Sequence, residues 1–255
     1  HFTTTNTFGA GHYLSTEYVD PRTYDSSYAS GYIGNTVGIS RSFGTTNILK
    51  GGYQWDQHSF NAMAGFEYGI WRTKYTSAAG IGMPNGVDAL NSSSPYSVGG
   101  YEIPGASWAA FVQASYDYAK RYFITATYRA EASSIFAPKN RTGHFPSVSA
   151  AWLISNEAFM QDQKVVSMLK LRASYGVTGN NNIPEYKYLS TYALNKLYQM
   201  NVAGSPSRLA NPYLHWETAN MAALGIDLEF IDRIDMSIDL YQTDNTGLLL
   251  NVPVA

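Results

Sequence analysis

The amino-acid sequence predicts an all-β fold, a transmembrane antiparallel β-barrel. Three observations lead to this fold class. Apolar and polar residues alternate with a period of two over runs that approach the roughly 9–11 residues of a tilted transmembrane strand. Tyr and Trp gather near the ends of these runs, where aromatic rings favour the membrane interface. Tight turns alternate along the chain with long connections, as in outer-membrane barrels.

The alternation is clear in the first long run, where the even positions from Phe60 to Ile70 carry Phe, Ala, Tyr and Ile. The odd positions between them carry Asn, Met, Gly and Glu. The same pattern recurs over residues 108–118, 122–129, 147–152, 169–175, 224–230 and 234–240. Since the second face of these runs carries charges at strand centres, we expect it to line a wet lumen while the apolar face meets lipid.

One stretch, GHFPSVSAAWLISNEAFM at residues 143–160, predicts a strand that leaves the membrane. Pro146 stands at its start, where a missing N–H is tolerated. Trp152 ends the apolar face and is expected at the interface. Ser155, followed by Asn156 and Glu157, predicts the N-cap of a short helix.

The connections are asymmetric. Residues 55–58, 119–121 and 231–233 predict tight turns, whereas 76–105 and 180–212 read as long loops rich in Gly, Ser, Pro and Asn. Short turns on one side and long loops on the other again favour the barrel, because structureless loops of this length are unusual in a soluble domain.

Composition excludes several functions. Charged residues make up 14% of the 255 residues and the net charge is −2, so there is no basic patch to suggest nucleic acid. Cys is absent, which excludes disulfides and thiolate metal sites. The five His are far apart, and Asp232, Asp235 and Asp239 lack the glycine-centred loop of a calcium site. We therefore expect no catalytic residue, no metal site and no cofactor.

Several longer motifs carry a family resemblance. They are RYFITATYR (121–129), the stretch 140–152, LKLRASYGVTGN (169–180), NPYLHWET (211–218) and GLLL (247–250). With these motifs in this order, the chain resembles the SusC/RagA family of TonB-dependent outer-membrane transporters.

The resemblance implies that residues 1–255 are a middle section of a plugged barrel of about 22 strands, with the plug and the C-terminal strands outside this chain. It implies import of an oligosaccharide, or alternatively a peptide, across the outer membrane. It further implies a SusD-like surface lipoprotein as a lid and the TonB complex as a partner through the N-terminal plug region. The lipid bilayer would surround the barrel.

The candidate site residues fall into two groups. Tyr96, Tyr101 and Trp108 lie in or beside the expected outward loop and could stack on a ligand, although a girdle or loop-packing role is an equal alternative. The second group is expected to face the lumen and to contact ligand or, by preference, the plug: Arg129, Glu131, Arg172, Asp227 and Glu229. Residues 129–134 and Phe136-Ala137-Pro138 depart from the family pattern at an outward loop, where they would bear on ligand or lid contacts.

Two other functions fit parts of the pattern. A passive porin or a surface-adhesion barrel would share the strands but need no TonB. A soluble carbohydrate-binding β-sandwich would cover Ile124 and Tyr128 with a second sheet and turn Arg129 to bulk water.

Overall fold

In a computed structural model, the structure of the protein is described for residues 1–20, 30–162, 165–198 and 201–250. Strands dominate, and the only helical elements in these ranges are three short 3₁₀ turns. The elements in chain order are β1 (Phe2–Val19), β2 (Tyr32–Trp55), β3 (His58–Ile81), η1 (Leu90–Ser92), β4 (Ser94–Tyr118), β5 (Tyr122–Ser133), β6 (Thr142–Leu153), η2 (Ile154–Asn156), η3 (Ala158–Met160), β7 (Val166–Asn180), β8 (Thr191–Tyr198), β9 (Asn201–Arg208), β10 (Glu217–Phe230) and β11 (Ile234–Thr246).

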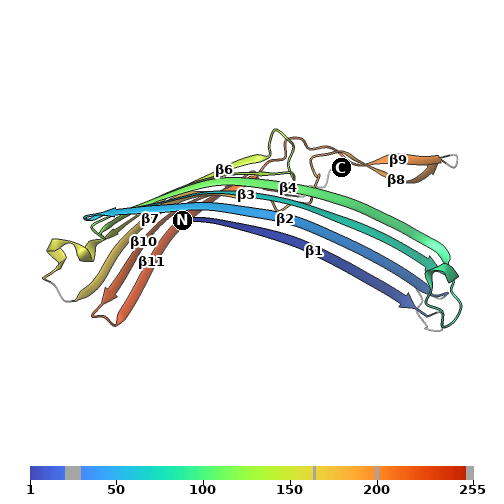
Figure 1. Cartoon of the computed structure of the whole chain (residues 1–255), viewed down its shortest axis with the longest axis horizontal. Helices are drawn as coiled ribbons and strands as arrows, with labels where there is room; N and C mark the ends of the chain where they lie inside the picture. Colours follow the sequence, from blue (N-terminus) through green and yellow to red (C-terminus); the bar gives the residue numbers. More distant parts are fainter. Residues whose placement is uncertain (21–29, 163–164, 199–200, 251–255) are drawn as a thin grey trace. The chain divides into compact units, whose positions relative to one another are not determined.

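Nine of these strands form one sheet in the order β1-β2-β3-β4-β5-β6-β7-β10-β11, and β8 and β9 form a separate hairpin (Figure 1). The pairs from β4 to β7, together with β7–β10 and β10–β11, are antiparallel. These antiparallel neighbours are consecutive in sequence except for β7 and β10, which are separated by the β8–β9 hairpin. The predicted all-β antiparallel architecture is therefore confirmed.

The chain divides into two compact units. The first comprises residues 1–5, 46–68 and 107–255, and the second comprises residues 6–45 and 69–106. Strands β5 to β11 belong wholly to the first unit, while the second unit is built from parts of β1 to β4.

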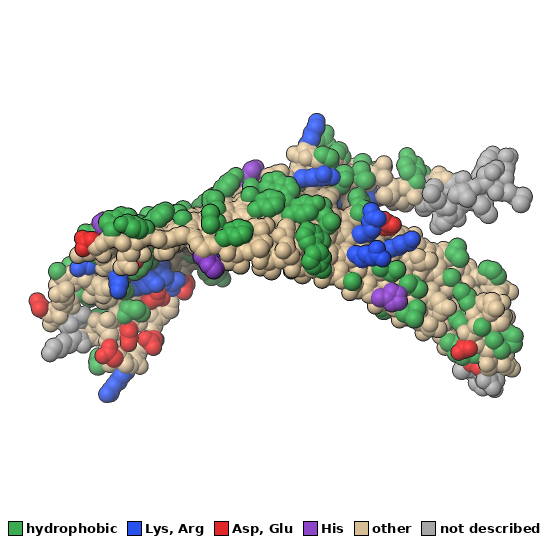
Figure 2. All heavy atoms as spheres, in the orientation of Figure 1, with side chains coloured by type: hydrophobic (Ala, Val, Ile, Leu, Met, Phe, Trp, Pro, Cys, Tyr) green, Lys and Arg blue, Asp and Glu red, His purple; other side chains and the backbone are tan. Residues whose placement is uncertain are grey.

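In the first unit, the apolar positions of neighbouring strands lie in register on one face. Ile124 is paired with Tyr116 and Ala150, and that row continues through Ala173 to Leu224. Hydrophobic side chains gather on this face over β4 and β6 (Figure 2). Ile124 is 51% exposed and Tyr128 44% exposed, so no second sheet of the described residues covers them. The β-sandwich alternative is therefore wrong, and the exposed apolar face is the one expected to meet lipid.

An aromatic row crosses the first unit near its tight turns. Trp55 stacks on His58 with ring centroids 5.0 Å apart, and His58 lies 4.9 Å from Tyr118. Tyr118 then stacks with Tyr122 at 6.3 Å, and Tyr122 with Trp152 at 6.2 Å. Aromatic rings favour the boundary between hydrocarbon and water, so this row supports placing the tight turns just outside the membrane.

The three predicted tight turns are confirmed by the strand ends at Trp55, Tyr118 and Phe230. At residues 119–120 and 231–232 both turn residues have positive φ, and the N–H after each turn donates to the carbonyl before it at 3.0 Å. This is the type I′ geometry whose twist matches that of the flanking strands. The turn conformation is imposed by the two long strands, since Ile231 and Ala119 do not favour positive φ on their own.

The prediction of two long irregular loops at 76–105 and 180–212 is wrong, because strands occupy parts of both stretches. Within 76–105, β3 continues to Ile81 and β4 begins at Ser94, and within 180–212 the β8–β9 hairpin forms. Gly and Ser weaken strand propensity, but paired backbones still satisfy their N–H and C=O groups in a ladder. Long extended hairpins therefore take the place of irregular loops.

The predicted helix capped by Ser155 is also corrected. Two 3₁₀ turns, η2 and η3, stand there, and neither has a side-chain cap. Glu157 instead accepts hydrogen bonds from Tyr122 Oη at 2.6 Å and Trp152 Nε1 at 3.0 Å, and pairs with Arg121 at 3.3 Å. The hydrogen bond from Tyr122, followed by that from Trp152, lowers the pKa of the Glu157 carboxyl. The strand β6 ends at Leu153, and the hydrogen bond from the Trp152 indole to Glu157 joins its last residues to the turn that follows.

None of the helical turns in the described ranges is long and apolar enough to cross a membrane.

Candidate functional site

The polar face of β7, β10 and β11 carries an ion cluster centred on Arg172. The guanidinium donates two hydrogen bonds to Asp227, from Nε at 2.8 Å and from Nη2 at 2.9 Å. Nη2 also donates to Asp239 at 3.0 Å, and Ser237 Oγ donates to Asp227 at 2.9 Å. Figure 2 shows basic and acidic side chains gathered over these strands. The fork of an arginine suits such planar, two-point pairing with a carboxylate.

Gly225 makes this cluster possible. It is the register partner of both Arg172 and Asp239. A Cβ placed on Gly225 would stand 2.8 Å from Arg172 Cζ and 2.6 Å from Asp239 Oδ1. The guanidinium therefore lies flat across the strand because β10 has no side chain at this position.

A second ion cluster lies on β3 and β5, also in the first unit. Arg129 Nη2 donates to Glu67 at 2.7 Å, and Arg129 Nε donates to Glu131 at 2.8 Å. The guanidinium carbon lies 5.7 Å from the centre of the Phe111 ring, which occupies the space over Gly65. This contact adds a cation–π attraction to the two ion pairs.

Four of the five residues predicted to line the lumen are therefore held in these two clusters, and Glu229 is the exception. Glu229 makes no ion pair with a described residue and lies directly opposite Asp235 on β11. Glu67 and Asp239 were not selected from the sequence, although both lie on the polar face of strands in which apolar and polar residues alternate. Each cluster joins one arginine to two carboxylates, so each carries a net charge of about −1 when all groups are ionised.

A small hydrophobic core stands at the ends of β6 and β7 opposite the tight turns. Phe136, Phe145 and Trp216 form it, and Phe136 is fully buried. The Trp216 ring lies 5.3 Å from each of the two Phe rings. Val177 and Leu214 pack against this cluster, which we call the rim core.

Hydrogen bonds lock two distant stretches of sequence together at the rim core. Trp216 Nε1 donates to the Arg141 carbonyl at 2.7 Å, and Asn140 Nδ2 donates to the Pro212 carbonyl at 3.0 Å. Arg141 Nε donates in turn to the Phe136 carbonyl at 3.1 Å. The motifs at 140–152 and 211–218 are thus parts of one packed structure. Because Phe136 is buried, its expected contact with ligand or lid is wrong.

Tyr96 and Tyr101 lie on β4 in the second unit, where they do not form one site. They are five residues apart on a continuous strand, so their side chains leave opposite faces. Tyr101 stacks on Tyr75 with centroids 5.0 Å apart, whereas Tyr96 meets Tyr32 edge-on at 6.3 Å. Both rings are more than half exposed. The Tyr75–Tyr101 pair therefore presents a flat aromatic surface.

Trp108 belongs to the first unit and is paired with Ala132 of β5. Its position alternates in step with Val112, which is 52% exposed on the apolar face. This placement suits the girdle alternative better than ligand stacking.

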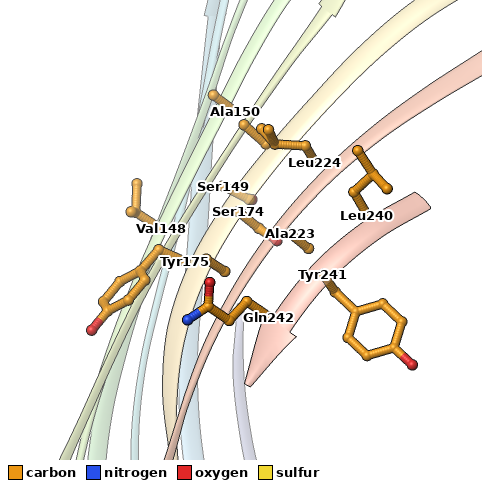
Figure 3. A pocket seen from close by; sticks show the side chains of 12 residues that line it. Val148, Ser149, Ala150, Ser174, Tyr175, Ala223, Leu224, Leu240, Tyr241 and Gln242 are labelled. Atoms are coloured by element: carbon orange, nitrogen blue, oxygen red, sulfur yellow. The ribbon is translucent and has the colours of Figure 1, made fainter. Parts of the chain in front are cut away.

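A shallow apolar hollow on the first unit is lined from β6, β7, β10 and β11. Figure 3 shows the small side chain of Ala150 near Leu224, with Val148 and Tyr175 along one side and Leu240 along the other. Few polar groups converge there to orient a soluble ligand, so the hollow has the character of a lipid-facing surface.

The described residues contain no group of three or more His, Cys, Asp or Glu side chains that could hold a metal ion. The side chains described above offer ion pairing and aromatic contact.

Comparison with known proteins places this geometry in context. A family model described as TonB dependent receptor-like, beta-barrel matches residues 1–255. TonB-dependent receptor P39 of Formosa agariphila is 32% identical over 204 residues, which covers 78% of this chain and 20% of that protein. TonB-dependent receptor SusC of Bacteroides thetaiotaomicron is 36% identical over 152 residues, which covers 56% of this chain and 15% of that protein.

The fold is similar to a solved structure of the RagAB peptide transporter, with a TM-score of 0.83 and 25% identity. That similarity covers 100% of this chain and 28% of the other. The chain thus spans about a fifth of the length of curated relatives such as P39.

Proposed function

The chain belongs to the TonB-dependent receptor-like β-barrel family, and from that membership we propose that it forms part of the wall of an outer-membrane importer. The observation that carries the proposal is the match over residues 1–255, together with relatives named as TonB-dependent receptors. In the whole protein, further strands complete the barrel and a plug fills it. An open sheet edge in hydrocarbon would otherwise leave backbone groups without partners.

The cargo that we propose is an oligosaccharide, with a peptide as the second candidate. The oligosaccharide is what the SusC/RagA resemblance implies, and similarity to the RagAB peptide transporter supports the peptide. We further propose a SusD-like surface lipoprotein as the lid and TonB as the energy-coupling partner. The protein would make and break no covalent bond, and it would release cargo when TonB shifts the plug between two states of different affinity.

The two ion clusters fit a structural role in this scheme. Arg129 and Arg172 are each paired with two carboxylates of their own wall, which holds the polar face in one arrangement. We propose that the carboxylate edges left exposed, and Glu229 in particular, contact cationic groups of the plug.

The test uses the full-length gene in its native bacterium. Deletion should abolish uptake of one labelled cargo class, oligosaccharide or peptide, and the wild-type gene should restore it. Adding an uncoupler that collapses the inner-membrane proton gradient should stop uptake. Uptake that continues at an unchanged rate would instead support the passive porin. A surface-adhesion barrel would leave uptake of both cargo classes unchanged after deletion.

The lid is tested by purification from outer membranes. A lipoprotein should co-purify with the protein in detergent at equal stoichiometry. Its absence after chemical cross-linking of intact cells would contradict the proposed partnership.

A further inference from the structure

Three exposed cations gather on one face of β2 and β3 in the second unit. Arg72 and Lys74 are two residues apart on β3, so they share a face, and both are exposed. Arg41 on β2 is also exposed. Figure 2 shows basic side chains gathered over this part of β2 to β4.

The alignment of β2 with β3 places Arg41 beside Arg72. Ser40 and Thr73 meet through their hydroxyl groups at 3.4 Å. Since side chains alternate along each strand, the next position on β2 and the preceding position on β3 face each other on the opposite side of the sheet. Arg41 and Arg72 are those positions, and they form a cross-strand pair.

Two like charges directly opposite each other destabilise a sheet unless an anion lies between them. Glu102 on β4 supplies one carboxylate and pairs with Arg72 Nε at 3.2 Å. Neither Arg41 nor Lys74 makes an ion pair with a described residue. The group, which we call the basic patch, therefore carries three positive charges against one negative charge.

The basic patch lies next to apolar side chains on the same face. Ile70 precedes Arg72 by two residues on β3 and is 42% exposed. The rings of Phe8 and Phe43 meet with centroids 5.0 Å apart, and Phe43 follows Arg41 by two residues on β2. Phe8 and Ile70 are exposed and Phe43 is half-buried between them. A row of such apolar groups beside a row of cations is the arrangement that suits the boundary of an anionic membrane.

We propose that the basic patch binds the phosphate groups of an anionic glycolipid in the outer leaflet of the membrane. Phe8, Phe43 and Ile70 would contact the upper part of its acyl chains, while Arg41, Arg72 and Lys74 contact phosphate. The inference rests on the membrane placement in the proposed function but concerns lipid and not cargo. Lipid is favoured over an acidic protein because the cations adjoin exposed apolar side chains on the same face.

The experiment compares the purified full-length protein with a variant that carries Arg41→Gln, Arg72→Gln and Lys74→Gln. The probes are lipid A bearing two phosphates, dephosphorylated lipid A and inorganic phosphate, each titrated in detergent. We expect phosphorylated lipid A to bind the variant about 100-fold more weakly, from about a tenfold contribution by each of two or more cations near the phosphates. Native mass spectrometry should also find less co-purified phosphorylated lipid on the variant.

A matched control neutralises three exposed cations in turns and loops of the first unit, Lys120→Gln, Lys139→Gln and Arg233→Gln, and should bind lipid A as the wild type does. Glu102→Gln removes the one carboxylate at the basic patch and should tighten binding, which a folding defect would not do. Dephosphorylated lipid A and inorganic phosphate should each bind weakly to the wild type.

Equal lipid binding by the patch variant and the control would overturn the proposal. So would strong binding of inorganic phosphate alone, or a patch variant that keeps its lipid but loses an acidic protein partner. Failure here is separable from failure of the proposed function. A patch variant that still imports cargo from the outer membrane, with unchanged lipid binding, would refute only the lipid site.

Discussion

Arg172 and Gly225 form a cross-strand pair in which the missing side chain of one makes room for the guanidinium of the other. A Cβ on Gly225 would stand 2.8 Å from Arg172 Cζ. Through this space the guanidinium reaches Asp227 on β10 and Asp239 on β11, at 2.8 and 3.0 Å. One glycine therefore sets the geometry of an ion cluster that spans three strands.

Replacing Gly225 with Val should displace the guanidinium and break its contacts. Overpacking costs about 1–3 kcal/mol, and the lost ion pairs add little because the groups are partly exposed. The free energy of unfolding of the full-length protein, measured by urea titration in detergent, should fall by that amount. Gly51→Val is the matched control, since a Cβ on Gly51 meets nothing within 4 Å. Equal losses in the two variants would show that Gly225 makes no special room.

Replacing Phe136 with Ala should loosen the rim core. Phe136 is completely buried, and removing such a ring costs about 3–5 kcal/mol. Because the rim core ties residues 140–141 to 212–216, limited proteolysis should cut the segment between β5 and β6 faster in this variant. Phe159→Ala serves as the control, because Phe159 is 69% exposed and its loss should change stability by less than about 0.5 kcal/mol. Unchanged proteolysis of the Phe136 variant would contradict the packing role.

Period-two alternation predicted the strands and the side of the sheet on which apolar residues gather, because successive side chains of a strand point to opposite faces. Ile124, Ala126 and Tyr128 could be assigned to one face and Arg129 to the other without knowing any neighbour. The tight turns were equally clear, since each falls between two strands that must pair.

Pairing between distant positions could not be predicted in this way. The ion pair between Arg129 and Glu67 depends on the order of the strands in the sheet and on their register. The residue pattern of one strand determines neither the order nor the register. Burial of Phe136 depends on Trp216, which follows it by eighty positions. The extension of the β3–β4 hairpin into 76–105 was missed because backbone pairing holds strands whose side chains have weak β-propensity.

The contacts of Glu157 should depend on pH. Hydrogen bonds from Tyr122 and Trp152 lower the pKa of this carboxyl, so its stabilising contribution is fully present above the ordinary carboxyl pKa. As pH falls below that value and through the lowered pKa, the carboxylate is protonated and the contribution is lost. The fluorescence of Trp152, taken as the difference between wild type and Trp152→Phe, should change in that acidic range. Glu157→Gln should remove the change, and a step that persists in this variant would assign the titration to another group.

Of the three aromatic candidates, Tyr101 should matter most for cargo. Its ring stacks on Tyr75 of β3, whereas Tyr96 leaves the opposite face of β4 and Trp108 lies with the apolar side chains of the first unit. A stacked pair of rings, of which Tyr101 is more than half exposed, can hold a sugar ring or a peptide side chain, and losing one ring should weaken cargo binding by about tenfold. Cargo titration of the full-length protein should find this loss for Tyr101→Ala and Tyr75→Ala. Tyr96→Ala, an equally exposed tyrosine on the same strand, should bind as the wild type does. If Tyr96→Ala were the weaker binder, cargo would contact the opposite face of β4, and the proposed role of Tyr101 would be wrong.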